Sequence, residues 1–358
     1  MVEEFTDEEF EMYSRQIVLN DIGYKGQERL KKGKVAVVGV GGLGCPAATL
    51  LAAMGVGYIR LIDRDIVERS NLHRQHLYTY KDIGYPKVEI AAKRLKELNP
   101  YIEIDPLPVS IDESTAIDVL RDVDVVVDGL DSFKARRAVN NACYKLSIPY
   151  VYASAIETYG AIMTIVPEKG PCLECLFPNV SDSELPTCAI VGVHPSVLQI
   201  LSGIEVYEAV NILTGKTPHL LGKLLLYDLV DLSSSLIDVA KSRHCPVCGG
   251  LGLEKEEVEY PVVEEVCARE GLPTYIINPG GIKSLDLEDV VNRLNDPSYK
   301  LVTSSRLGIT LQIDRKVKLS LLKTGIAVIE GVRSREEALK IYKSIMERII
   351  NKEALPIL

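Results

Sequence analysis

Apolar runs alternate with helical spacing over most of the chain. Four short, largely apolar stretches predict buried strands. After the second of them, apolar residues recur every three or four positions from Val88 to Leu98, which gives a helix one buried face. Such strands separated by helices favour an α/β fold with a doubly wound, mostly parallel, Rossmann-like sheet. The apolar stretches are residues 35–40, 58–62, 123–128 and 149–153.

The pattern changes in the second half of the chain. Residues 158–166 predict an antiparallel extension of the sheet, and residues 167–195, rich in Pro, Cys and Ser, predict a long crossover. A charged stretch at 253–259 is typical of a linker. A chain of 358 residues exceeds the usual size of one core. We therefore expect a large domain over residues 1–252 and a small C-terminal α+β domain over residues 260–358.

A glycine-rich turn follows the first predicted strand. Gly39, Gly41 and Gly44 fit G-x-G-x-x-G between a strand and a helix, with Gly42 inside the motif. Backbone N–H groups of such a turn approach phosphates, and Asp63, at the end of the next strand, is placed to bind a ribose. The motif alone is compatible with NAD, with ATP, or with a turn that binds nothing.

Basic and acidic residues further along favour a triphosphate. Arg74 and Lys87 follow Asp63, and a triphosphate needs more positive charge than a dinucleotide's pyrophosphate. Lys87 lies in the first turn of its helix, where the helix dipole disfavours a cation, although taken alone a solvated lysine is the simpler explanation. Asp131 follows another strand and suits Mg²⁺, or else caps the next helix.

Four of the eight cysteines form two C-x-x-C pairs. Four thiolates suffice for a closed, structural Zn²⁺ site, whereas redox pairs or plain buried cysteines are the alternatives. Cys188 lies apart from these pairs, in the crossover. The paired cysteines are Cys172, Cys175, Cys245 and Cys248.

Net charge and hydropathy limit the classes of binding partner that we expect. The formal net charge is −9, which gives no support to nucleic-acid binding or to a basic membrane-binding surface. Charged residues or glycine interrupt the apolar runs, so we expect no membrane span, and the acidic start does not resemble a secretory signal. We expect a cytoplasmic protein.

Taken together, the motifs resemble the MoeB/ThiF/HesA and ubiquitin-activating enzyme superfamily, from about residue 13 to residue 250. They are Y-S-R-Q-I, G-V-G-G-L-G, D-R-D-I-V-E-R-S-N-L-H-R-Q, G-Y-P-K and the cysteine pairs. The resemblance implies an ATP-dependent adenylyltransferase that activates the C-terminal glycine of a ubiquitin-like β-grasp protein ending in Gly-Gly. The alternatives are an NAD-dependent oxidoreductase and a non-catalytic scaffold half of an activating enzyme.

The resemblance also implies roles for single residues. The glycines would cradle ATP, Asp63 would hold its ribose, and Asp131 would position Mg²⁺. Arg15 would act on the phosphates of the other subunit in a homodimer. Cys188 would accept the carrier as a thioester, as in ubiquitin-type members, or handle sulfur, as in ThiF-like members; a small buried residue is the alternative. The run Asp131-Ser132 stands where bacterial relatives usually carry Asp-Asn, which favours the eukaryotic type. The phosphates would be bound by Asn71, Arg74, Gln75 and Lys87.

The last hundred residues predict a hairpin at 317–330 and a helix at 335–349. They resemble a small tail of some MoeB/ThiF relatives, in a place where ubiquitin-type enzymes recruit a conjugating enzyme. A sulfur donor is another partner class, and a module for stability or dimerisation is the simpler alternative. A docking role predicts that deleting residues 260–358 spares adenylation.

Overall fold

A large mixed sheet forms the core of the protein in this computed structural model, which describes residues 5–178, 180, 182, 191–250, 259–269, 272–281, 284–296 and 298–349. The strand order is β3-β2-β1-β4-β5-β6-β7-β8. The first five strands pair in parallel, and β6, β7 and β8 extend the sheet antiparallel. The predicted fold class is confirmed. The strands are β1 (Lys34–Val38), β2 (Tyr58–Ile62), β3 (Glu103–Leu107), β4 (Val125–Asp128), β5 (Tyr150–Ile156), β6 (Tyr159–Ile165), β7 (Lys223–Asp228) and β8 (Ser233–Asp238).

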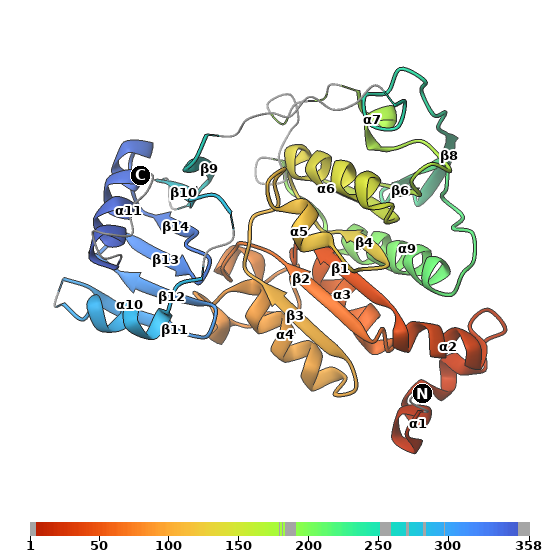
Figure 1. Cartoon of the computed structure of the whole chain (residues 1–358), viewed down its shortest axis with the longest axis horizontal. Helices are drawn as coiled ribbons and strands as arrows, with labels where there is room; N and C mark the ends of the chain where they lie inside the picture. The colour runs from red at the N-terminus through yellow and green to blue at the C-terminus, as the bar shows by residue number, and fades with distance from the viewer. Residues whose placement is uncertain are drawn as a thin grey trace.

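Helices cover both faces of this sheet (Figure 1). Alternate residues of β1 divide between two apolar clusters: Val35 and Val37 face α3, α4 and α9, whereas Ala36 and Val38 face α5 and α6. The period of two in a strand is what buries both faces. The helices are α1 (Asp7–Ile17), α2 (Gly23–Lys32), α3 (Gly44–Ala53), α4 (Lys87–Leu98), α5 (Ala116–Leu120), α6 (Phe133–Leu146), α7 (Leu173–Leu176) and α9 (Pro195–Leu213), with short 3₁₀ turns η1 (Arg69–Asn71) and η2 (Tyr80–Asp82).

Helix α9 is long and apolar enough to cross a membrane by length and composition. This corrects the expectation that no apolar segment reaches that length. In the structure, however, 56% of its apolar window is buried, and the helix packs against α3 and against β4, β5 and β6. Its hydrophobicity on nearly all sides is that of a core helix.

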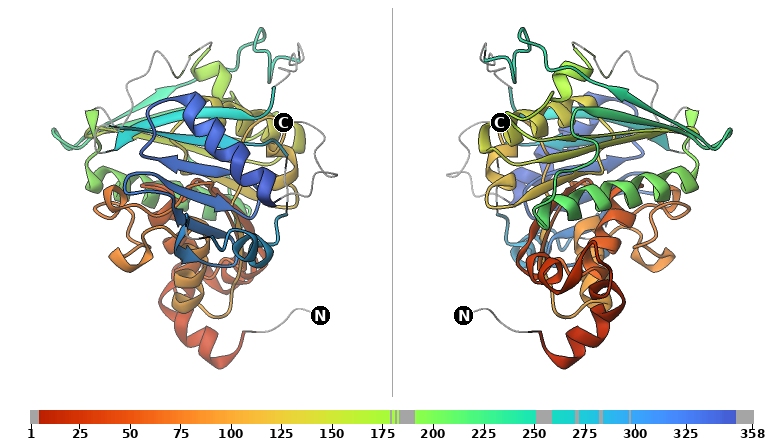
Figure 2. Two further views of the ribbon diagram at one scale, coloured as in Figure 1. Left: turned by 90° about the vertical axis from the view of Figure 1, so that its left-hand side faces the viewer. Right: turned by 90° about the vertical axis from the view of Figure 1, so that its right-hand side faces the viewer.

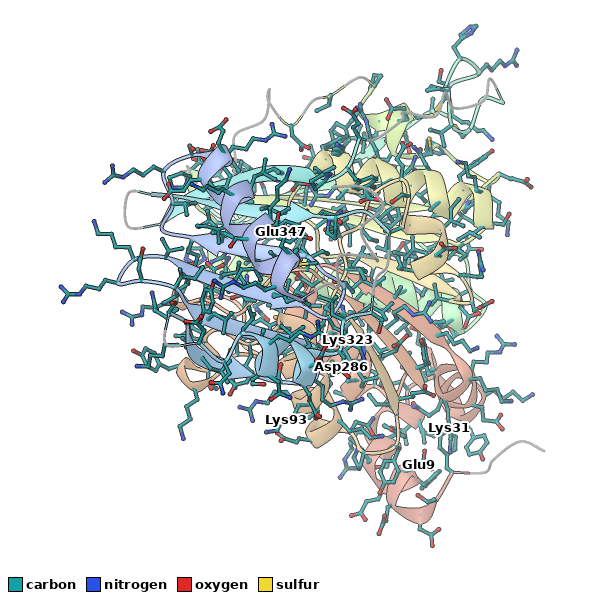
Figure 3. All side chains as sticks on the ribbon, turned by 60° about the vertical axis from the view of Figure 1, so that its left-hand side comes forward. Glu9, Lys31, Lys93, Asp286, Lys323 and Glu347 are labelled. Carbon is teal, nitrogen blue, oxygen red and sulfur yellow. The ribbon has the colours of Figure 1, made fainter. Side chains whose placement is uncertain are left out.

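The N-terminal helices lie at one end of the molecule (Figure 1). Thr6 and Glu9 form a capping box at the start of α1. Glu9 and Lys31, both labelled in Figure 3, join α1 to α2 by an ion pair of 2.9 Å. Tyr13 packs on Gly55, where a side chain would lie 2.5 Å from the Tyr13 ring, and its hydroxyl accepts from Asn99. Helix α1 is therefore fixed beside the carboxyl ends of α3 and α4.

A second, antiparallel sheet forms the C-terminal module, residues 259–349 as described. Its strand order is β11-β12-β13-β14-β10-β9, and helices α10 and α11 cover one face. The expected hairpin is present as β13 and β14, followed by α11. Figures 1 and 2 show the module beside the β2–β3 edge of the large sheet. Its elements are β9 (Val262–Arg269), β10 (Leu272–Asn278), α10 (Leu287–Arg293), β11 (Lys300–Ser304), β12 (Gly308–Gln312), β13 (Lys318–Leu322), β14 (Ala327–Glu330) and α11 (Arg335–Ile349).

Candidate nucleotide site and cysteine cluster

Two turns meet where the strand order reverses, between the carboxyl ends of β1 and β4. A side-chain carbon at Gly39 would lie 2.4 Å from the carbonyl oxygen of Gly129, and one at Gly129 would lie 2.1 Å from that of Gly39. Gly39 also has φ +84°, which favours glycine. A carbon at Gly44 would collide with the Gly39 carbonyl at 1.8 Å. The glycines at 39, 44 and 129 are thus required by backbone packing alone.

Gly41 differs from these glycines because packing does not require it. A side-chain carbon there would meet its nearest atom, Nε2 of Gln75, at 3.7 Å. A side chain would fit the protein but would occupy space beside the turn. A glycine here leaves the backbone of the turn uncovered by a side chain just before a ten-residue helix, and a phosphate needs such an uncovered backbone to approach closely.

Two of the predicted phosphate-binding residues, Arg74 and Gln75, face this turn. Arg74 Cδ lies 3.6 Å from the side-chain position of Gly42, and its guanidinium donates to the carbonyl of Ser70 at 2.8 Å. Gln75 is buried, and its Oε1 has no hydrogen-bond partner among the described residues. An unpaired buried oxygen is costly, so a ligand donor or water is expected there. The residues therefore fit a bound nucleotide.

Asn71 has a local structural role. Its side chain is buried, and Oδ1 accepts from the backbone N–H of Glu68 at 3.1 Å, which closes the η1 turn. Asp63 also binds backbone: one carboxylate oxygen accepts from Val40 inside the glycine turn at 2.8 Å, and the other accepts from Asp65 at 2.7 Å. Burial raises the pKa of Asp63, and the charge of Lys87 partly offsets this rise. Asp63 thus fixes the glycine turn to the end of β2.

Lys87 is buried and paired, which rules out the solvated alternative. Its Nζ lies 2.7 Å from Oδ2 of Asp65, and its side chain is 5% exposed. Burial lowers the pKa of Lys87, but the charges of Asp65, Asp63 and Asp131 outweigh it and raise the pKa above its ordinary value. The structure therefore holds a permanent cation within electrostatic reach of three carboxylates next to the glycine turn.

Asp131 is exposed beside these groups and is not the cap of α6. Ser132 has that role, since its hydroxyl accepts from Ala135 at 3.2 Å. The carboxylate of Asp182, in the crossover, accepts from the backbone N–H groups of Phe133 at 2.5 Å and Lys134 at 3.0 Å. The start of α6 is thus satisfied without Asp131, whose carboxylate is left for solvent or a ligand.

A buried ion pair holds the turn that carries Asp131. Asp128 Oδ2 accepts from Nε of Arg136 at 3.0 Å and from the Tyr150 hydroxyl at 2.5 Å. Its other oxygen accepts from the N–H of Leu130 at 2.8 Å, and Arg136 donates to the Leu130 carbonyl at 2.5 Å. The pair therefore binds both backbone polar groups of the residue before Asp131. Neither residue was predicted to belong to the site, although both are charged residues on a strand and a helix that a short turn connects.

Glu205 of α9 lies beneath the same pair. It is fully buried, its Oε1 accepts from the N–H of Asp128 at 2.8 Å, and Oε2 has no partner in the described part of the chain. Burial raises the pKa of Glu205 well above its usual range, and the nearby charge of Asp128 adds to the rise. Burial therefore favours the protonated form of this side chain.

Arg15 and Cys188 are not joined to this site by the structure. Arg15 is exposed on α1, whose Gln16 contacts Met54 at the far end of α3. Helix α3 runs from the glycine turn for ten residues, or about 15 Å. Arg15 therefore lies at the opposite end of α3 from its own chain's glycine turn. Cys188 lies outside the described residues.

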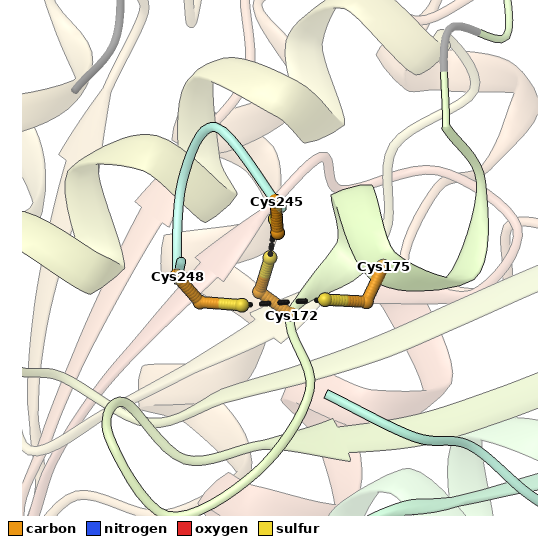
Figure 4. Close-up of side chains that lie close together, drawn as sticks. All are labelled: Cys172, Cys175, Cys245 and Cys248. Carbon is orange, nitrogen blue, oxygen red and sulfur yellow. Dashed lines mark hydrogen bonds between the residues drawn. The ribbon is translucent and has the colours of Figure 1, made fainter. Parts of the chain in front are cut away.

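The two C-x-x-C pairs converge on one point (Figure 4). All four sulfur atoms lie within 4.8 Å of one another, with Cys172–Cys245 at 3.5 Å and Cys175–Cys248 at 3.2 Å. Sulfurs around tetrahedral Zn²⁺ lie about 3.8 Å apart, given a Zn–S bond of about 2.3 Å. The cluster is compatible with zinc. It joins α7 to the segment after β8, and a carboxylate–guanidinium pair from Glu174 to Arg137 at 3.0 Å ties α7 to α6.

Fold and site together define a class: an α/β protein with a glycine turn, cationic side chains and an aspartate at the switch point of its sheet. The profile of the ThiF family matches residues 13–247. The chain therefore belongs to the ThiF family, and the resemblance to the MoeB/ThiF superfamily is confirmed.

Several named relatives are similar over most of their length. The sulfur carrier protein adenylyltransferase of Thermus thermophilus is 40% identical, covering 72% of this chain and 97% of that protein. The SAMP-activating enzyme E1 of Haloferax volcanii is 38% identical over 70% of this chain and 94% of its own. The sulfur carrier protein ThiS adenylyltransferase of Bacillus subtilis is 32% identical over 92% of this chain and 97% of its own, so this match includes most of the C-terminal module.

Solved structures agree on the fold. The crystal structure of E. coli MccB with MccA-N7isoASN has a TM-score of 0.60 at 25% identity and covers 66% of this chain and 75% of that chain.

Proposed function

We propose that this protein activates the C-terminal carboxylate of a small ubiquitin-like β-grasp protein by adenylation. The carboxylate oxygen attacks the α-phosphorus of ATP, the bond to the β-phosphate oxygen breaks, and pyrophosphate leaves. The product is a mixed anhydride of carrier and AMP. The observation that carries the proposal is the convergence of Arg74, Gln75, Lys87 and Asp131 around one open glycine turn, together with the named adenylyltransferase relatives.

Each residue has a distinct task in this proposal. Two anions approach each other during the attack, so fixed cations lower the barrier. Arg74 and the buried Lys87 supply that charge, and Gln75 offers its unpaired Oε1 and its amide group to the ligand. Mg²⁺, held by Asp131, would neutralise phosphate charge. Asp63 keeps the glycine turn in place and retains lone pairs that accept from ribose hydroxyls.

A second copy of the chain completes the site in the proposal. Apolar side chains are exposed on and between α1 and α2, with Val18 at 75%, Leu19 at 52% and Tyr24 at 44%. Large exposed apolar groups on neighbouring helices favour a protein partner. A homodimer covers them and carries Arg15 to the phosphates of the other subunit.

The β7–β8 end of the sheet is the proposed carrier-binding face. Strand β8 is an edge strand with every residue exposed, and it presents unpaired backbone groups. Leu232 at its start is 74% exposed and Leu236 is 54% exposed. An edge strand with apolar neighbours is suited to a β-rich partner. The cysteine cluster, as a structural zinc site, would hold the segment that follows β8.

ATP–pyrophosphate exchange tests the proposal directly. Exchange should require both a β-grasp carrier ending in Gly-Gly and Mg²⁺, and a carrier shortened by its last two residues is the matched control. Exchange that ignores the carrier contradicts the proposal, and absence of exchange with every such carrier would favour a non-catalytic scaffold. Transfer to Cys188, to a conjugating enzyme or to a sulfur donor is a later step, and a cytoplasmic location suits these partners.

A further inference from the structure

The C-terminal module forms hydrogen bonds with the loop that precedes Lys87. The carbonyl oxygen of Gly84, three residues before Lys87, accepts from the hydroxyls of Thr303 at 3.0 Å and Thr310 at 2.7 Å. Both threonines are buried, Thr303 at 8% exposure and Thr310 at 2%. Gly84 has φ +92°, so this conformation of the loop favours glycine. Two buried hydroxyl groups of the module thus donate to one backbone oxygen of this loop.

The module also holds the other side of Lys87. The carboxylate of Glu89, two residues later, accepts from the backbone N–H groups of Arg306 at 3.1 Å and Leu307 at 3.0 Å. Close packing joins the same places, because a side-chain carbon at Gly308 would lie 2.7 Å from Pro86 Cγ. The β11–β12 hairpin therefore contacts the chain both before and after Lys87.

A third contact reaches the acidic partners of Lys87. Arg64, between Asp63 and Asp65, forms an ion pair with Glu264 of β9. Asp65 in turn binds Lys87 at 2.7 Å. Beneath these polar contacts, Ile66 packs in one apolar cluster with four module residues. These are Ile276, Leu322, Ile326 and Val328.

We propose that the C-terminal module is a positioning element of the adenylation site, which fixes Lys87 and its partner Asp65 for the phosphates of ATP. The inference rests on the proposed function. It replaces the expectation that the module can be deleted without loss of adenylation. Deletion would remove the partners of Gly84, Glu89 and Arg64 together and expose the apolar cluster around Ile66.

The test uses the full chain with single hydroxyl changes. Thr310→Val removes the bond to Gly84 and a second bond of 2.7 Å to the Ser320 hydroxyl, whereas Thr310→Ser keeps the hydroxyl. Thr274→Val is the matched control, because Thr274 is a fully buried threonine of β10 whose hydroxyl makes no bond to any described residue. The measurements are exchange kinetics, melting temperature and hydrogen exchange of residues 83–89 without nucleotide.

Positioning predicts that Thr310→Val lowers exchange efficiency about tenfold or more, with a higher KM for ATP, because small displacements of a binding group are costly. Hydrogen exchange of residues 83–89 should rise, while Thr310→Ser and Thr274→Val stay within about twofold of the native protein. The inference is overturned if Thr310→Val differs from the native protein only in melting temperature. It is also overturned if Thr310→Val and Thr274→Val give the same exchange kinetics, melting temperature and hydrogen exchange.

A second variant tests the inference if the Thr310→Val protein does not fold. Glu264→Gln removes the charge at a partly exposed pair and should raise the KM for ATP by about threefold. An unchanged KM and unchanged hydrogen exchange at 83–89 would again overturn the inference. If the native protein lacks exchange with any carrier, the proposed function fails, and the hydrogen-exchange comparison still decides whether the module holds the loop.

Discussion

Arg136 binds Asp128 at 3.0 Å in the interior of the protein, where the two side chains are 8% and 0% exposed. A buried pair loses more when one partner is removed than a surface pair, because the remaining charge stays unpaired. The pair also holds both polar groups of Leu130, and therefore the turn before Asp131.

We predict that Arg136→Met lowers the free energy of unfolding by about 3–5 kcal/mol, measured by urea denaturation. Arg137→Met is the control, since the Arg137–Glu174 pair is more exposed and should lose about 1 kcal/mol or less. Adding Asp128→Asn to Arg136→Met should restore part of the loss. Equal losses in Arg136→Met and Arg137→Met would contradict the assignment.

Lys87→Met should reduce ATP–pyrophosphate exchange by on the order of 10³-fold, because it removes the buried cation to which we assign neutralisation of phosphate charge. Lys93→Met, on the exposed face of the same helix (Figure 3), should leave exchange unchanged. Comparable losses in both variants would show that the helix, and not the charge of Lys87, is what matters.

Arg15→Ala should leave the fold intact and abolish exchange, if the arginine serves the other subunit. Equal amounts of the Arg15→Ala and Lys87→Met proteins are then mixed under conditions in which dimers dissociate and re-form. About half of the dimers are then heterodimers with one complete site of two, so about a quarter of the native activity should return. Each parent alone stays inactive. No recovery in a mixture shown to contain heterodimers would place Arg15 outside the site.

The cysteine cluster should bind one zinc ion per chain. Metal analysis should find it in the native protein and in Cys143→Ala, whose thiol is buried elsewhere, but not in Cys245→Ser. Chelation should lower the melting temperature of the native protein, because a structural metal contributes folding free energy. Native protein without metal and with an unchanged melting temperature after chelation would refute the site.

Leu236→Glu should raise the KM for the carrier at least tenfold while the KM for ATP stays constant, because a charge on the exposed apolar edge opposes burial by a partner. Ser234→Glu, also exposed on β8, tests whether charge alone is responsible and should have a smaller effect. A higher KM for ATP in Leu236→Glu would mean that the substitution disturbs the nucleotide site instead.

The sequence was most informative where one residue type permits only one structure. Strand β2 matches its predicted bounds, and the cysteine pairs meet. These features depend on local periodicity or on a spacing with few geometric solutions. Side-chain partners were less predictable: nothing near Lys87 in sequence reveals that Asp65, twenty-two residues earlier, makes it a buried ion pair.

Contacts between distant segments were missed for the same reason. Thr310 and Gly84 are separated by 226 residues, and a threonine in a strand gives no sign of which carbonyl it binds. The alternation in residues 300–312 is too short to identify β11 and β12 as strands, and the bulge between Leu301 and Thr303 interrupts it. The proposed role of the C-terminal module therefore rests on contacts that only the tertiary structure shows.

The interlocked turns at Gly39 and Gly129 have a mechanical consequence. The backbones at Gly39 and Gly129 cannot move closer together without a steric clash, because neither glycine has a side chain to separate them. Two loops ninety residues apart are thus in direct backbone contact, and the N–H of Gly129 donates to the carbonyl of Val38 at 2.7 Å. The distance between the glycine turn and Asp131 is therefore set by contacts within the protein itself.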